Sequence, residues 1–128
     1  MQEKRILLIE DDRDISDLIG YILSDDFYHV TVCATVAEGE SAINTATPDV
    51  LILDIMLPDG NGVDLCNKIK AQSNTRHVKV ILMSALEKPA NSTADHFIGK
   101  PFNIHTLKST VSACLYSLGV LLFQVALL

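Results

Sequence analysis

The chain has 128 residues, of which 48% are apolar and 20% charged, and its formal net charge is −6. This length and balance are typical of one folded globular domain and exclude a disordered chain. The negative charge, without any cluster of Lys and Arg, argues against a nucleic-acid-binding surface on this domain.

Five short apolar runs alternate with amphipathic stretches along the chain. The runs are rich in Val, Ile and Leu and lack polar alternation, which is typical of strands that are buried on both faces of a sheet. They cover residues 6–9, 30–33, 50–53, 80–83 and, more weakly, 96–98.

Helical patterns lie between these runs. The first has apolar residues at i, i+3, i+4, i+7 and i+8 between residues 15 and 23. Thr35 and Glu38 form a capping-box pair at the start of a second helix, and Asn61 opens a third. Asn103 is a suitable N-cap for the last helix. Strands alternating with helices predict an α/β domain with an open parallel sheet and helices on both faces.

Polar side chains follow four of the five apolar runs. In open α/β sheets, ligands bind outside the carboxyl ends of the strands, so we expect these side chains to converge at one edge. They are Glu10, Asp11 and Asp12 after the first run, Asp54 after the third, Ser84 after the fourth and Lys100 after the fifth. Asp59 and Gly60 suit a turn in the loop that follows Asp54.

The chemistry of this set indicates a phosphate and metal site. Two negative charges about 4 Å apart repel by roughly 4 kcal/mol at an effective dielectric constant of 20. Glu10, Asp11 and Asp54 would therefore need a cation, and a hard divalent ion such as Mg²⁺ prefers carboxylate oxygens. A carboxylate can attack phosphorus and form an acyl phosphate, with Lys100 neutralising charge and Ser84 donating a hydrogen bond.

Four strings in order resemble the motif blocks of receiver domains of bacterial two-component response regulators. They are LLIEDDRDI, VLILDIMLPDGNG, VILMSA and FIGKPF, and they span about residues 5–102. Within this CheY-like superfamily, the acidic pair and the D-x-M-L-P-D-G block are most similar to the OmpR-type subfamily of transcription factors. The resemblance implies a flavodoxin-like fold with a five-stranded parallel sheet of order 2-1-3-4-5.

The resemblance also implies the metal and phosphate roles. It makes Asp54 the phosphoacceptor and Glu10 and Asp11 the acidic pair that holds Mg²⁺ or Mn²⁺ together with Asp54. Met56 would add its backbone carbonyl. Asp12 reads as a third acid that is not a ligand, although a pairing of Asp11 with Asp12 stays open.

The switch residues follow from the same resemblance. Ser84 would be the switch hydroxyl and Lys100 the phosphate-binding lysine. Phe97 occupies the aromatic switch position, where the family most often has Tyr, and a core aromatic is an equally good reading of it. The implied partners are a sensor histidine kinase and a downstream output protein or domain, in the cytoplasm, with no catalysis beyond self-phosphorylation and self-dephosphorylation.

One segment departs from the family pattern. Ser84 and Lys100 are sixteen positions apart, several fewer than is usual, and residues 88–92 form a poor helix. We therefore expect a shortened fourth helix and an altered output face. A phosphate-independent interaction module stays an alternative for this reason. An aspartyl-nucleophile phosphatase is disfavoured, because such enzymes carry a general acid two positions after the nucleophile and Met56 cannot transfer a proton.

We expect a receiver domain over residues 1–117 and an apolar extension of the last helix over residues 118–128, LGVLLFQVALL. This extension carries too many large apolar side chains to remain in water, since burying each is worth about 1.5–3 kcal/mol.

Residues 118–128 should therefore make the chain self-associate or bind a partner. Truncation after Tyr116 should give a monomer that still accepts phosphate on Asp54, as sedimentation and intact-mass measurements would show. A monomeric full-length chain at micromolar concentration would contradict this expectation.

Overall fold

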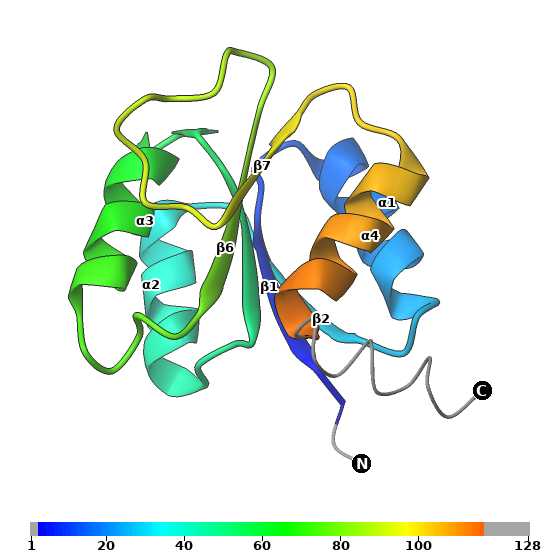
Figure 1. The fold of residues 1–128 in the computed structure, drawn as a ribbon, viewed down its shortest axis with the longest axis horizontal. Coiled ribbons are helices and arrows are strands. Elements are labelled where there is room, and N and C mark those ends of the chain that lie inside the picture. Colours follow the sequence, from blue (N-terminus) through cyan, green and yellow to red (C-terminus); the bar gives the residue numbers. More distant parts are fainter. Residues whose placement is uncertain (1–2, 117–128) are drawn as a thin grey trace.

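The computed structural model of the chain describes residues 3–116, which form a parallel sheet between two layers of helices (Figure 1). The sheet has the strand order β2-β1-β3-β6-β7, which confirms the predicted flavodoxin-like topology. Its strands are β1 (Arg5–Ile9), β2 (His29–Cys33), β3 (Val50–Asp54), β6 (Lys79–Ser84) and β7 (His96–Gly99). The helices are α1 (Arg13–Ser24), α2 (Val36–Thr45), α3 (Gly62–Ala71) and α4 (Ile104–Leu115).

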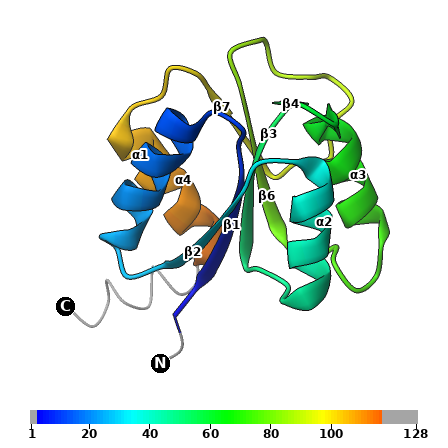
Figure 2. The same cartoon turned by 180° about the vertical axis from the view of Figure 1, so that it is seen from behind.

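The interior strands divide the apolar core into two layers. Leu7 and Ile9 of β1 pack into the core under α2 and α3, whereas Ile6 and Leu8 pack into the core under α1 and α4. Figure 2, seen from behind, shows the same separation of the helix pairs. Every residue of β3 is buried, because helices cover both of its faces. The continuous apolar runs of the sequence are thus explained.

Three of the helices begin at the predicted caps. The side chains of Thr35, Asn61 and Asn103 each accept a hydrogen bond from a backbone N–H in the first turn that follows. These bonds satisfy donors that have no partner within the helix.

The segment between β6 and β7 contains no helix, so the structure goes beyond the expected shortening of the fourth helix. Residues 85–95 instead form a loop that is attached to α3. The side-chain oxygen of Asn67 accepts hydrogen bonds from the N–H (3.1 Å) and the hydroxyl (2.7 Å) of Thr93. The Asn67 amide also donates to the carbonyl of Asn91 at 3.4 Å, and Cys66 Sγ lies 3.8 Å from the Thr93 hydroxyl. Polar contacts with α3 therefore hold this segment, in place of the apolar packing of an amphipathic helix.

Two aspartates complete hydrogen bonding at the amino edge of the sheet. Asp49, just before β3, accepts from the N–H of Arg5 at 2.8 Å. Asp95, just before β7, accepts from the N–H of Val80 at 2.8 Å and forms an ion pair with Lys70 at 2.7 Å. Each therefore fixes the start of a neighbouring strand.

A short antiparallel pair, β4 (Met56–Leu57) and β5 (Gly60–Asn61), follows β3 directly.

Within residues 3–116, no helix combines the length and the apolar character needed to cross a membrane. The predicted apolar extension over residues 118–128 lies outside the described residues.

Replacing Asp95 with Asn should lower the free energy of unfolding by about 1 kcal/mol at pH 7, because the variant loses the ion pair with Lys70. Burial alone would raise the pKa of Asp95, but the hydrogen bonds from Lys70 and Val80 lower it below its ordinary value. The stabilisation is therefore present above about pH 4 and is lost as the pH falls through the lowered pKa of the folded state. Urea unfolding at pH 7 and pH 3 would test this, and an equal difference at both values would contradict it.

Candidate functional site

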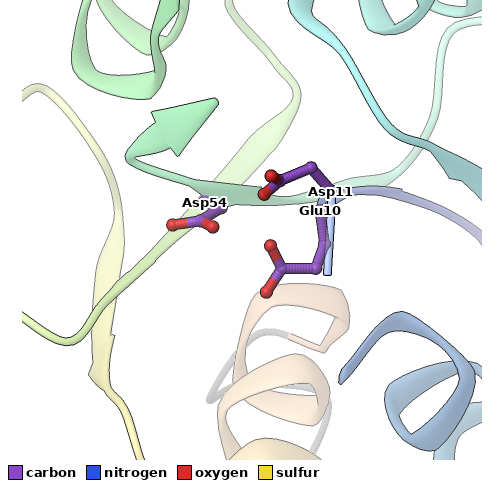
Figure 3. A group of neighbouring side chains, drawn as sticks. All are labelled: Glu10, Asp11 and Asp54. Atoms are coloured by element: carbon purple, nitrogen blue, oxygen red, sulfur yellow. The ribbon is translucent and has the colours of Figure 1, made fainter. Parts of the chain in front are cut away.

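Three carboxylates meet at the carboxyl edge of the sheet. Glu10 follows β1, Asp11 comes next, and Asp54 ends β3, and one carboxylate oxygen from each lies within 4.8 Å of the other two. Figure 3 shows the three carboxylates directed toward a common space. Glu10 and Asp54 are only 2% and 7% exposed, whereas Asp11 is exposed. The group therefore opens to solvent on the side of Asp11.

The register of the parallel strands produces this convergence. Ile9 of β1 pairs with Leu53 of β3, so the residues that follow them, Glu10 and Asp54, emerge beside each other. The N–H of Glu10 donates to the carbonyl of Cys33 at 3.0 Å, which extends the β1–β2 ladder to the position of this acid. The strand pairing itself thus fixes the backbone on both sides of the site.

Lys100 provides a positive charge to two of these acids. Its Nζ donates to Glu10 Oε1 at 2.5 Å and to Asp54 Oδ2 at 3.2 Å, and its side chain is 16% exposed. The backbone N–H of Lys100 donates to the carbonyl of Ser84 at 2.8 Å, which holds the lysine at the end of β7. Burial would lower the pKa of Lys100, but its hydrogen bond to Glu10 and the charges of Glu10 and Asp54 raise it.

The Glu10 carboxyl has a raised pKa. Burial, and then the neighbouring carboxylate of Asp54, raise the pKa of Glu10 to about 7 against the opposing effect of Lys100. Its Oε2 is buried and has no hydrogen-bond partner among residues 3–116. A buried carboxylate oxygen without a partner is costly, and a bound cation would satisfy it. The three carboxylates therefore fit a metal ion.

Both oxygens of Asp54 have donors. Oδ1 accepts from the backbone N–H of Met56 at 3.3 Å, and Oδ2 accepts from Lys100. Met56 is 65% exposed, and it contacts the site through its backbone N–H. The orientation of the Asp54 carboxylate is therefore set from two directions.

Ser84 lies at the end of β6 and is buried. Its hydroxyl oxygen accepts from the N–H of Leu86 at 3.0 Å, which leaves the hydroxyl hydrogen available to another acceptor.

Phe97 of β7 is partly buried and packs against the core layer under α2 and α3. It also lines a cavity of about 80 Å³ with Pro89 and Ser92 of the loop over residues 85–95. Phe97 thus packs against the core and shares a cavity with that loop.

Asp12 does not belong to the group of three carboxylates. Its Oδ1 accepts from the N–H groups of Asp14 (3.0 Å) and Ile15 (3.2 Å), so it is the N-cap of α1. An acid directly before an amphipathic helix is the signal that could have identified this role from the sequence.

Asp59 has a partner that the sequence did not indicate. It lies in the turn between β4 and β5 and accepts from the N–H groups of Val36 (2.7 Å) and Ala37 (3.0 Å) at the start of α2. These backbone hydrogen bonds lower the pKa of the Asp59 carboxyl. The residues are more than twenty positions apart, so local patterns carry no signal for this contact.

Comparison with known proteins agrees with this geometry. Residues 6–112 match the model of the response regulator receiver domain. Regulatory protein VanRB of Enterococcus faecalis is 34% identical over 91% of this chain and 54% of its own length. Transcriptional regulatory protein KdpE of Staphylococcus aureus is 30% identical over 85% of this chain and 48% of its own length. The chain spans about half the length of these curated relatives.

A solved structure gives the same result. The receiver domain protein (CheY-like) of Methanospirillum hungatei superposes with a TM-score of 0.83 at 30% sequence identity, over 89% of this chain and 94% of that one. Residues 6–112, which match the receiver-domain model, contain the acidic group and Lys100. This chain belongs to the response regulator receiver domain family, and its relatives among the OmpR-type regulators agree with the resemblance of its motifs.

Proposed function

We propose that the chain is a phosphorylation-activated signalling switch that accepts a phosphoryl group on Asp54 from a sensor histidine kinase. The observation that carries this proposal is the meeting of Asp54 with two acids and Lys100 at the carboxyl edge of the sheet. A nucleophilic carboxylate, a cation-binding group and a fixed positive charge are the parts that phosphoryl transfer needs.

In the proposed reaction, an Asp54 carboxylate oxygen attacks the phosphorus of a phosphohistidine. The new O–P bond forms as the P–N bond breaks, and the electron pair of the P–N bond returns to the imidazole nitrogen. Lys100, already within 3.2 Å of Asp54, neutralises the phosphoryl oxygens, and the Ser84 hydroxyl donates to one of them. Positioning and charge neutralisation account for the catalysis, because phosphoryl transfer requires little covalent chemistry from the protein beyond the attack by Asp54.

The ion that fits the three carboxylates is Mg²⁺ or Mn²⁺. Glu10, Asp11 and Asp54 would hold it through carboxylate oxygens and Met56 through its backbone carbonyl. When bound, the ion supplies positive charge that offsets the repulsion between the carboxylates and the incoming phosphoryl group.

The acyl phosphate would then act on Ser84 and on Phe97. The Ser84 hydroxyl would turn to donate a hydrogen bond to a phosphoryl oxygen. Phe97 would move relative to the loop over residues 85–95, with which it lines a cavity. A changed surface at this loop would be read by an output protein or domain in the cytoplasm. Output on DNA would come through such a partner, since the sequence has a net charge of −6 and no cluster of Lys and Arg.

A second candidate function is a phosphate-independent interaction module. The observation that favours it is the loop over residues 85–95, which stands where the family has a fourth helix. Such a module would bind its partner equally well with and without a phosphoryl mimic on Asp54. The complete set of site residues favours the switch.

Incubation with acetyl phosphate and Mg²⁺ should add one phosphoryl group to the protein. The Asp54→Asn variant should accept none, because an amide keeps the shape of the side chain but is not a nucleophile. Intact-mass spectrometry measures both outcomes, with Asp25→Asn, at the far end of α1, as a control that should label fully. Full labelling of Asp54→Asn would place the nucleophile elsewhere.

Mg²⁺ should bind weakly to the unphosphorylated protein and cause shifts in the amide NMR signals near residues 10, 11 and 54. The double variant Glu10→Ala, Asp11→Ala should lose this binding, because it removes two of the three negative charges that attract a hard cation. Unchanged titration curves for the double variant would refute the metal assignment. The Asp25→Asn variant removes one distant negative charge and serves as the control for general electrostatic effects.

A further inference from the structure

The first turn of α2 receives its hydrogen-bond acceptors from two different places. Its cap, Thr35, accepts from the N–H of Glu38 at 3.1 Å, which is a local bond. The N–H groups of Val36 and Ala37 are instead satisfied by the two carboxylate oxygens of Asp59, at 2.7 and 3.0 Å. Asp59 is an exposed residue on another loop, so its bidentate contact joins two elements that the sequence separates.

The loop that carries Asp59 is the one that holds the phosphoacceptor. Asp59 lies at the turn of the β4–β5 hairpin, and the hairpin begins at Met56, whose N–H donates to Asp54 Oδ1. The N–H of Gly62 closes the base of the hairpin by donating to the carbonyl of Ile55 at 2.7 Å. A Cβ on Gly62 would overlap the carbonyl oxygen of Asp54, so the chain passes directly against the acceptor. The hairpin is therefore fixed at its base beside Asp54 and at its tip by Asp59.

A second close contact supports the attachment of the tip. A Cβ added to Gly60 would lie 3.1 Å from Val36 Cγ2, so the backbone after Asp59 packs closely against the first residue of α2. The tip of the hairpin and the start of α2 thus meet through both hydrogen bonds and packing. Without the carboxylate of Asp59, two N–H groups at the helix start would lose their protein acceptors, and the hairpin would lose the bonds that hold its tip.

We propose that Asp59 is a positioning residue for the phosphorylation site: through the β4–β5 hairpin it fixes the Met56 backbone against Asp54. The inference rests on the proposed function of Asp54 as phosphoacceptor. Asp59 does not contact the reacting atoms and acts only through Met56. Partners that orient the groups of a metal site in this way typically change metal affinity or activity by about 10–100-fold when they are removed.

The experiment compares Asp59→Ala and Asp59→Asn with the control Asp49→Ala. Asp49 is also an aspartate that accepts a backbone N–H, that of Arg5 at 2.8 Å, but it lies at the opposite edge of the sheet. Mg²⁺ affinity is measured by amide NMR, labelling from acetyl phosphate at saturating Mg²⁺ by intact mass, and the free energy of unfolding by urea.

Asp59→Ala should weaken Mg²⁺ binding and slow labelling of Asp54 by about tenfold each, at the low end of the range for such partners. Asp59→Asn should lie between the parent and Asp59→Ala, because its one carbonyl oxygen can accept one of the two hydrogen bonds. Asp49→Ala should leave both quantities unchanged even though it loses stability. The Met56 amide signal should shift in the Asp59 variants and not in the control.

Two results would overturn the inference while the proposed function stands: parent-like binding and labelling in Asp59→Ala, or equal losses in Asp49→Ala. If the parent itself accepts no phosphoryl group, the proposed function fails, and the Mg²⁺ titrations alone then decide the role of Asp59. Equal affinity of the parent and Asp59→Ala for Mg²⁺, or no binding by either, would then overturn it.

Discussion

The burial of Glu10 next to Asp54 is the constraint on which the rest of the site depends. Two acids this close, one of them 2% exposed, destabilise the folded chain unless positive charge reaches them. Lys100 supplies that charge from the end of β7, at the cost of being largely buried itself. The N–H of the lysine in turn donates to the carbonyl of Ser84, which holds its backbone at the end of β6. The carboxyl ends of four strands, β1, β3, β6 and β7, are thus tied together by one electrostatic requirement.

In this arrangement two acids compete for the positive charge of one lysine. In the present structure Lys100 is shared between Glu10 and Asp54, and one oxygen of Glu10 has no partner among the described residues. A group of new negative charge on Asp54 would compete with Glu10 for the same lysine. The backbone N–H of Lys100 is hydrogen-bonded to the carbonyl of Ser84. A movement of the lysine would therefore displace the ends of β6 and β7. The site is therefore suited to passing an electrostatic change on to the strands that flank it.

The sequence predicts the sheet and the acidic edge because both depend on local patterns. Each buried strand is a short apolar run, and in a parallel sheet the residue after such a run reaches the carboxyl edge, which places Glu10, Asp54, Ser84 and Lys100 there. The caps at Thr35, Asn61 and Asn103 are predictable for the same reason. The bonds of Asp59 and Asp49 are not, since their acceptors and donors are 22 to 44 positions apart. The attachment of Thr93 to Asn67 likewise depends on a tertiary contact. The poor helix pattern of this segment could therefore predict that the fourth helix is shortened, but not which contacts hold the segment instead.

The loop over residues 85–95 has a consequence for how this chain is told apart from others of its kind. A fourth helix would present rows of side chains into which a partner helix could pack. Here a partner would meet the exposed Leu86 and, at Asn91 and Thr93, groups that are already hydrogen-bonded to α3. A protein shaped to grip a helix at this face would gain little packing and would have to break those bonds. A partner that recognises this loop would therefore need a binding surface different from one that fits a helix.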